Sequence, residues 1–429
     1  MVNRNLGGYE MKKKAFVALV SAMVCTVSVF GMTGCKGSNS NEVEFFSSKS
    51  ENAQIMKKLV DQFNKEHAKE GVKVVLNTPA DAGTVLKTRL TKNDIPDIIA
   101  YGGDQTYTEL ESAGVLKDLS QESYMNSVSD QYMQMVYDVQ KDRKKKAYAV
   151  PYATNASGVI YNVDKFKELG LKIPKTWDEF EEVIRRIEDA GGQPFEYAFK
   201  DDWTLLPPWN SMAPDLAPET FYDERLAGKT TFESTHKEIA DKYLELLKHG
   251  QKDIMGTGYD DANKAFANGD AYMLINGNWA ISEIKKNNPD IHLDMFALPA
   301  SNDESKNYVT SGVDVLLCAS AKTKHPKIVK EFLEFMMKPE NNQKYIDDQF
   351  AFSPINGVEQ KDETVASAQK DIEKGKVANF PDHYYPSGYD LASILSEYAM
   401  NYSTGMKDEE NTKEFLKNLD TQYDAVNNK

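Results

Sequence analysis

The sequence has few cysteines and lacks the motifs typical of nucleotide-binding and catalytic proteins. It contains three cysteines in 429 residues. Cys25 and Cys35 both fall in the first 35 residues, so Cys318 alone serves the rest of the chain and an intramolecular disulfide is excluded there. Six histidines are scattered without the spacing of metal ligands. Walker, Gly-x-Gly-x-x-Gly and Gly-x-Ser-x-Gly patterns are missing, so we expect no metal, no cofactor and no enzymatic activity.

Positive charge is also scarce. The chain has 51 Lys and Arg against 66 Asp and Glu, which gives a net charge of −15. Binding a nucleic-acid backbone requires clustered positive charge, so nucleic acid is excluded as a partner. The basic stretch at 141–146 is short, and we interpret it as a solvated turn.

The N-terminal region lacks an apolar run long enough to cross a membrane. Residues 15–30 are uncharged and apolar, but these 16 residues fall short of the roughly 20 that a spanning helix needs. Three lysines precede the run and small residues follow it up to Cys35, a pattern typical of a cleaved secretory signal. The sequence around Cys35 resembles the bacterial lipobox, which implies a diacylglycerol on that cysteine. An ordinary signal peptide that happens to contain a cysteine is the alternative.

We therefore predict a signal peptide at 1–34, cleaved before Cys35, and a polar tether at 35–42. Cleavage removes four basic side chains and one acidic side chain, so 47 and 65 remain and the net charge becomes −18. The predicted location is the extracellular face of the cytoplasmic membrane, with the membrane as a partner through the lipid. A lipid-tethered protein indicates a Gram-positive cell rather than one with a periplasm.

After residue 42 the chain alternates short apolar strands with amphipathic helices. Strands are expected at 43–46, 73–76 and 97–100, and helices at 52–69 and 84–92. This rhythm predicts an α/β architecture with largely parallel strand pairing. The stretch 195–221 is rich in Pro and Trp and lacks periodicity, so we expect mostly loop there. Further helices are expected at 235–247, 260–268, 328–337 and 412–426.

Four groups of segments, in order along the chain, carry a family resemblance. They are NDIPDII at 93–99 with GVLKDL at 114–119; YAVPY at 148–152 with GVIYN at 158–162 and PKTWDEF at 174–180; FANGDAYM at 266–273 with NGNW at 276–279; and 327–335 ahead of SPI at 353–355. Together they resemble family 1 of the extracellular solute-binding proteins of ABC importers. That group includes maltose-binding and other oligosaccharide-binding proteins.

The resemblance implies a two-lobe, periplasmic-binding-protein-like fold with a ligand cleft and hinge crossovers. Lobe 1 would comprise 43–149 and 309–350, and lobe 2 would comprise 150–308 and 351–429. The chain would cross between the lobes near 148–152, 299–309 and 350–354. Closure of the cleft would engage a ligand from both sides and present a new surface to a membrane permease. We expect the protein to act as a monomer.

Aromatic side chains are the first candidates for holding a sugar, because they stack on the C–H faces of sugar rings. Trp203 and Trp209 lie in the irregular stretch, with packing under a loop as the alternative. Trp279 aligns with a ligand-stacking tryptophan of the maltose-binding type, and Tyr385 crowds the last crossover. Trp177 begins a helix and is interpreted as a core residue.

Strand ends and crossovers supply polar partners for sugar hydroxyls. The candidates are Ser48 and Glu51 after the first strand; Tyr101, Asp104 and Gln105 after the third; Tyr152 and Asn155 at the first crossing; Asn276 ahead of Trp279; and Gly312 and Asp314 after the second crossing. Glu51 could instead be a helix first-turn charge, and Asp314 could instead make a structural bond.

These observations predict a lipid-anchored receptor that binds a carbohydrate, preferably an oligosaccharide, and delivers it to an ABC importer permease. The same fold binding a polyamine, an amino sugar, a peptide or another non-sugar solute is the first alternative. An excess of cleft carboxylates over aromatic rings would favour it. An extracellular glycoside hydrolase is a second alternative, and a sensor subunit for a membrane kinase is a third.

Overall fold

The computed structural model describes residues 41–79, 81–140, 146–386 and 388–427, and of Gln105 it describes the backbone alone. Cys35, the predicted signal at 1–34 and most of the predicted tether lie outside the described residues. So does most of the basic stretch at 141–146. Within the described ranges, none of the helices is both long and apolar enough to cross a membrane.

The described strands form one mixed sheet in the order β2-β1-β3-β8-β4-β6-β5, with β7 paired to β4 and β9 paired to β8. They are β1 (Glu42–Ser47), β2 (Lys73–Asn77), β3 (Ile98–Tyr101), β4 (Val150–Asn162), β5 (Gln193–Phe195), β6 (Ala271–Gly277), β7 (Leu293–Phe296), β8 (Val309–Ala319) and β9 (Val377–Ala378). The first three strands pair in parallel, as predicted. Beyond them the pairing is mixed, so the prediction of largely parallel pairing holds only in part: β5–β6 and β8–β9 are parallel, whereas β8 pairs antiparallel with β3 and β4, and β4 pairs antiparallel with β6 and β7.

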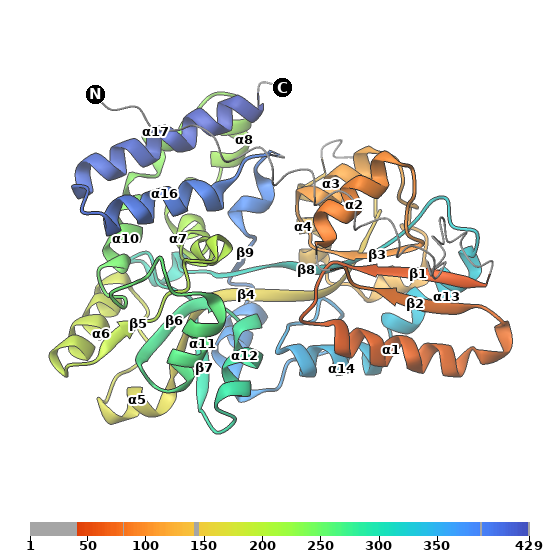
Figure 1. Cartoon of the computed structure of the whole chain (residues 1–429), viewed down its shortest axis with the longest axis horizontal. Helices are drawn as coiled ribbons and strands as arrows, with labels where there is room; N and C mark the ends of the chain where they lie inside the picture. Colours follow the sequence, from red (N-terminus) through yellow and green to blue (C-terminus); the bar gives the residue numbers. More distant parts are fainter. Residues whose placement is uncertain (1–40, 80, 141–145, 387, 428–429) are drawn as a thin grey trace, which may run out of the picture. The chain divides into compact units, whose positions relative to one another are not determined.

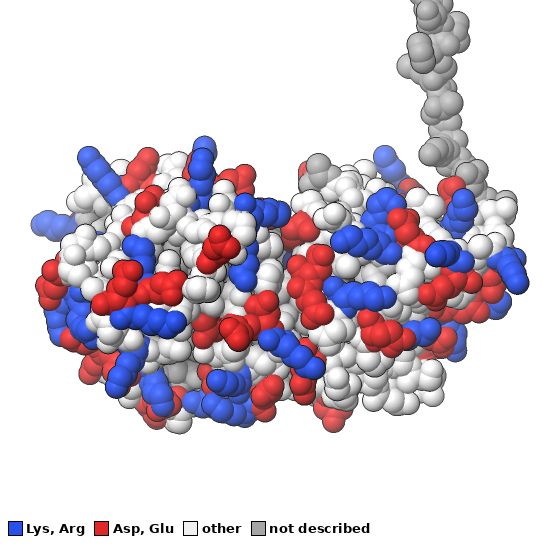
Figure 2. All heavy atoms as spheres, turned by 90° about the horizontal axis from the view of Figure 1, so that it is seen from below, with Lys and Arg blue, Asp and Glu red and all other residues white. Residues whose placement is uncertain are grey.

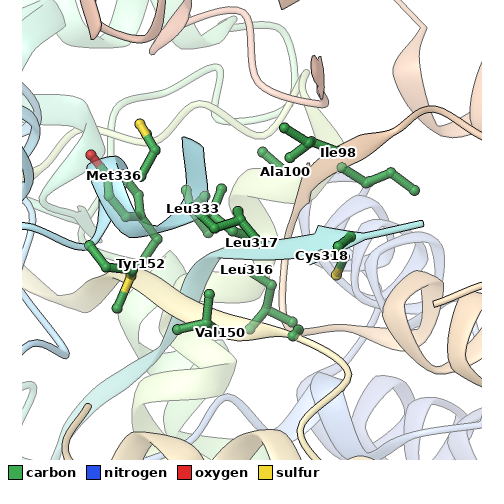
Figure 3. Packing of buried hydrophobic residues seen from close by; sticks show 14 of the residues in the cluster. Ile98, Ala100, Val150, Tyr152, Leu316, Leu317, Cys318, Leu333 and Met336 are labelled. Carbon is green, nitrogen blue, oxygen red and sulfur yellow. The ribbon is translucent and has the colours of Figure 1, made fainter. Parts of the chain in front are cut away.

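One hydrophobic core forms around β1, β3 and the ends of β4 and β8 (Figure 3). Its helices are α1 (Ala53–Glu66), α2 (Ala82–Thr91), α3 (Gln105–Ser112), α4 (Asp130–Asp138), α13 (Pro326–Met336) and α14 (Pro339–Gln349). Phe332 contacts Phe45 and Phe63 edge-on, with ring centroids 5.2 and 5.1 Å apart. Each fully buried ring of this kind contributes about 1.5–3 kcal/mol. The predicted helix at 52–69 is confirmed as α1, with Ile55 and Leu59 buried beside Phe63.

Two further buried clusters form around the other ends of β4 and β8, the two strands that connect the cores. Their helices are α5 (Val163–Glu168), α6 (Trp177–Asp189), α7 (Leu206–Leu216), α8 (Phe221–Leu226), α9 (Phe232–Thr235), α10 (Lys237–Leu247), α11 (Tyr259–Ala267), α12 (Trp279–Asn287), α15 (Ala366–Glu373), α16 (Leu391–Ser403) and α17 (Asp408–Asn427). Buried Arg225 on α8 binds Asp420 and Asp424 of α17 at 3.2 and 2.7 Å, and so fixes the C-terminal helix to this side.

The prediction of mostly loop at 195–221 is wrong for residues 206–216, which form α7. Pro207 and Pro208 occupy the first turn of the helix, where a missing backbone N–H costs nothing. Residues 207–213 are all buried, so α7 has no polar face and its sequence shows no amphipathic period.

Strands β4 and β8 connect the cores, and Figure 1 shows them running between the two groups of elements. They pair from Val150 opposite Leu317 to Ser157 opposite Thr310. On β4, the buried side chains up to Ala153 belong to the first core, and those from Ala156 onward belong to the other two clusters. The chain meets β4 again at Phe352, whose N–H donates to the Thr154 carbonyl at 2.9 Å. On β4 the change of core falls between Ala153 and Ala156, and the crossings near 148–152, 299–309 and 350–354 stay a prediction.

Candidate ligand-binding cleft

A cavity of about 440 Å³ lies where β1 and β3 end. Ser48 and Lys49 follow β1, and Asp104 follows β3 by a short turn. Asn155 on β4 and Asp314 on β8 close the cavity from the crossover strands. Crevices of open α/β sheets form beyond the carboxyl ends of their strands, which explains why polar loop residues meet there.

A charged network forms the wall of this cavity. The Lys49 ammonium donates to Asp314 Oδ1 at 2.7 Å and lies 3.6 Å from Glu51 Oε1. The Asn155 amide donates to the same Asp314 oxygen at 2.8 Å. Burial alone would lower the pKa of Lys49, but the carboxylates of Asp314 and Glu51 outweigh it and raise that pKa. Lys49 is therefore a fixed cation at every physiological pH.

Asp104 has a second, structural role at the start of α3. Its carboxylate accepts the Thr106 N–H at 2.8 Å and caps the helix. Burial raises the pKa of Asp104, while nearby His383 and the Thr106 bond act in the opposite direction. His383 lines the same cavity from the last crossover segment.

A second cavity of about 630 Å³ shares Lys49 and Asn155 with the first. Its other side is aromatic, with Trp203, Tyr259 and Trp279 on the wall. The rings of Trp203 and Tyr259 are 4.9 Å apart and inclined by 60°. The two cavities therefore adjoin at Lys49 and Asn155, with polar strand ends around the first and aromatic rings around the second, and together they are the candidate cleft.

The position of Trp279 is set by the end of β6. The Asn278 side-chain oxygen accepts the Ala156 N–H at 2.7 Å and fixes the turn into α12 against β4. The Trp279 ring lies over Gly277, where a Cβ atom would come within 2.2 Å of two ring carbons. Gly277 is thus required for the ring to lie in this position.

Two buried polar atoms in the wall of the cleft have no hydrogen-bond partner in the described part of the protein. They are the side-chain oxygen of Asn155, an acceptor, and the indole N–H of Trp279, a donor. Buried polar groups are nearly always paired, but each of these atoms exposes less than 1 Å², so a bound hydroxyl would reach it only after neighbouring side chains move.

The structure brings eight of the expected site residues to the walls of these two cavities. They are Ser48, Glu51, Tyr101, Asp104, Asn155, Trp203, Trp279 and Asp314. Gln105 begins α3, but its side chain lies outside the described residues, as does Cys35.

Two expected aromatic residues are in the core instead. Trp209 is 0% exposed on α7 and contacts His236 and Phe415, with ring centroids 5.8 and 5.4 Å away. Tyr385 is 2% exposed and lies edge-on to Tyr389 and Tyr423. A ring already covered by other rings has no free face, so neither residue belongs to the candidate cleft.

Three further expected residues also line neither cavity. Tyr152 is fully buried in the first core, against Tyr345. Asn276 is buried, and its side-chain oxygen accepts the N–H of the next residue at 3.0 Å. A Cβ on Gly312 would lie 2.5 Å from the Phe380 ring, so this glycine makes room for the last crossover segment.

Sequence reasoning missed several residues of the cleft: Lys49, Asp81, Tyr259, Asp260, Glu283 and His383. Lys49 lies between the expected residues Ser48 and Glu51 at a strand end, so its position in the sequence was enough to predict it as a site residue. Tyr259 is held beside Trp203 because its N–H donates to Asp201 at 2.7 Å, a contact across 58 positions that no local pattern reveals.

The arrangement is suited to binding. Its polar groups are hydrogen-bond donors and acceptors, and its rings offer stacking surfaces. No group of His, Cys, Asp and Glu with metal-binding geometry occurs among the residues that the structure describes. Cys318 is buried, and burial raises the pKa of its thiol to about 12, so it is not a nucleophile.

Two cores joined by long crossover strands, with a ligand-sized cleft at the strand ends, define a two-lobe binding protein of mixed α/β fold. The chain belongs to the family of bacterial extracellular solute-binding proteins, whose family model matches residues 47–343. The members of this family are binding proteins, and this protein is not an enzyme.

Several known proteins are similar to this chain. The multiple sugar-binding protein of Streptococcus mutans is 34% identical over 339 residues, which cover 75% of this chain and 78% of that protein. The melibiose/raffinose/stachyose-binding protein MelE of Bacillus subtilis is 24% identical over 66% of this chain and 67% of its own length. RafE in complex with raffinose is 29% identical with a TM-score of 0.76, covering 89% of this chain and 99% of RafE. The apo form of RafE from Streptococcus pneumoniae has a TM-score of 0.77 at the same identity, covering 91% and 100%.

Proposed function

We propose that this protein is an extracellular receptor that binds a carbohydrate and delivers it to the permease of an ABC importer. The proposed site is the cleft described above, with Trp203, Tyr259 and Trp279 as stacking surfaces and the polar strand ends as hydroxyl partners. An oligosaccharide is the preferred ligand, because the two cavities adjoin and several rings line one of them. The names of the relatives, which refer to multiple sugars, raffinose and stachyose, support this class of ligand.

The observation that carries the proposal is the pairing of aromatic rings with unpartnered polar atoms in one cleft. A sugar offers an apolar C–H face and a hydroxyl edge, and it needs both kinds of contact. The Trp279 ring has one face against Gly277 and lines the cavity, while its own N–H and the Asn155 oxygen lack partners.

We further propose that the cleft lies between two lobes that close on the ligand. We place the lobes at 43–149 with 309–350 and at 150–308 with 351–429; the hydrophobic cores support a division of this kind, although the first core extends to Ala153 and to Val358 and begins at Val313 on β8. Closure would change the outer surface that the permease meets, and the protein would act as a monomer.

We also propose that Cys35 carries the lipid anchor of a Gram-positive lipoprotein, after removal of residues 1–34. The sequence pattern around Cys35 supports this, and a tether would raise the local concentration of the receptor at its permease. Mass spectrometry of the mature N-terminus tests it, since a diacylglyceryl cysteine is expected. A mature protein that begins elsewhere would refute it.

A binding screen tests the proposed function. The purified protein is titrated calorimetrically with neutral oligosaccharides, including raffinose and stachyose, and with polyamines and short peptides. Saturable binding of a saccharide with unchanged sugar after incubation is the expected result. Binding of a polyamine or peptide alone, or turnover of the sugar, would overturn it.

One observation favours a second candidate, a cationic solute on the same fold. Six carboxylates line the two cavities against four aromatic rings. Most of these carboxylates are already engaged, for example Asp314 by Lys49, and Glu283 by Lys286 at 2.6 Å. We therefore prefer the carbohydrate.

A further inference from the structure

The walls of the cleft are strongly acidic, whereas charges of both signs are mixed over the face of the molecule in Figure 2. The carboxylates that line the two cavities are Glu51, Asp81, Asp104, Asp260, Glu283 and Asp314. Lys49 is the one lysine or arginine among the described residues that line them, and His383 is the other basic group.

Lys49 is not free to receive an anion. Its ammonium is 2.7 Å from Asp314 and 3.6 Å from Glu51, so two carboxylates already balance its charge. An incoming carboxylate or phosphate would have to displace one of them and leave it unpaired in a partly buried site, which is costly. His383 lines the same cavity as Asp104, so it also has an anionic neighbour.

The carboxylates on the aromatic side add to this effect. Asp260 and Glu283 line the same cavity as Trp203 and Trp279; Glu283 is paired with Lys286 at 2.6 Å, so Asp260 supplies most of the net negative charge on this side. Low-dielectric walls concentrate the field of such charges into a cleft, and ligands of the same sign are repelled from it. An ammonium group on a ligand would be stabilised there by the same field.

We propose that the cleft selects saccharides by charge: it admits neutral and amino-bearing saccharides and excludes those that carry a carboxylate or a phosphate. This inference rests on the proposed carbohydrate-binding function and specifies its ligand class. The specificity-determining groups are Lys49, held by Asp314 and Glu51, and the pair Asp260 and Glu283.

The test compares matched saccharides by calorimetry. Raffinose is compared with its derivative in which the galactosyl C6 hydroxyl is oxidised to a carboxylate, and galactose with galacturonate and galactosamine. Each set is measured at about 20 mM and about 500 mM NaCl, where the Debye length falls from roughly 20 to 4 Å. We expect each carboxylate to bind at least about tenfold more weakly than its neutral parent at low salt. The gap should narrow at high salt, and galactosamine should bind within about threefold of galactose or more tightly.

Two double variants separate the effect of the cleft's charge from the effect of its shape. Asp260→Asn with Glu283→Gln should reduce the ratio between the dissociation constants of the carboxylate and its neutral parent, whatever happens to the neutral affinity. The control pair Glu168→Gln with Glu409→Gln removes the same charge from exposed positions outside the cavities and should leave the ratio unchanged.

The outcomes are distinguishable. Three results would overturn the charge selection while leaving carbohydrate binding intact. In the first, the acidic saccharide binds as tightly as its neutral parent. In the others, the difference in affinity does not respond to salt, or both variant pairs change the ratio of dissociation constants equally. If no saccharide binds, neutral or charged, the proposed function itself fails and the inference fails with it.

Discussion

Replacing Trp279 with alanine should weaken saccharide binding without unfolding the protein. The ring has one face against Gly277, so a ligand can cover only the other. A buried aromatic side chain covers about 150–250 Å², and half of that at about 25 cal/mol per Å² gives roughly 2–3 kcal/mol. Part of this face is already shielded without ligand, since the residue is only partly exposed. The expected loss is therefore about 1–3 kcal/mol, or on the order of 5-fold to 150-fold in Kd.

The assay is calorimetric titration of the wild type and the variant with the tightest saccharide from the screen, together with thermal unfolding of both. Trp279→Phe should recover part of the affinity, because a smaller ring still stacks. Trp177→Phe is the control, since Trp177 is 5% exposed and lines neither cavity. It should lower the unfolding temperature and leave Kd unchanged. A folded Trp279→Ala protein whose Kd is within twofold of wild type would refute the stacking role.

Three other predictions follow from single contacts. Gly277→Ala should weaken saccharide binding about as much as Trp279→Ala, because the new Cβ displaces the Trp279 ring. The double variant should bind no more weakly than either single variant. Additive losses of binding free energy in the titration would contradict this. Arg225→Met should lower the free energy of unfolding by about 3–5 kcal/mol in denaturant titrations, because buried Asp420 then loses its positive partner and keeps only the N–H donors of Phe232 and Glu233. Exposed Lys57→Met should cost less than about 1 kcal/mol, and equal losses would count against a stabilising role of the Arg225 ion pair. Burial raises the pKa of Glu196 to about 7, so the native state holds this proton up to higher pH than the unfolded state and stability should fall between about pH 4.5 and 7. Glu196→Gln should flatten the pH dependence of the free energy of unfolding in this range. At pH 8 it should raise that free energy by up to about 2 kcal/mol, a figure reduced for solvent screening. Parallel curves for both proteins would refute the raised pKa of Glu196.

The local pattern of apolar residues was enough to predict the amphipathic elements from the sequence. Ile55, Leu59 and Phe63 recur every four residues, and they face the core on α1. The strand ends at Ser48 and Tyr101 could also be located, because a short apolar run followed by polar residues marks the edge of a sheet. These features are local, so the sequence carries them directly.

Other parts of the site depend on packing that no local pattern encodes. Trp203 and Trp209 are six positions apart and look alike in the sequence, yet Trp203 is 39% exposed and Trp209 is 0% exposed. The difference arises because α7 begins between them and is buried on nearly every side. His383 reaches the cleft from a crossover segment more than 60 residues beyond Asp314, and its position depends on how both cores meet.

A crystal structure of the protein with a bound saccharide tests the central claim most directly. We predict a sugar ring stacked on Trp279, with hydroxyls on the Asn155 oxygen and the Asp314 carboxylate. A saccharide bound elsewhere, with the cleft between Lys49 and Trp279 empty, would contradict it.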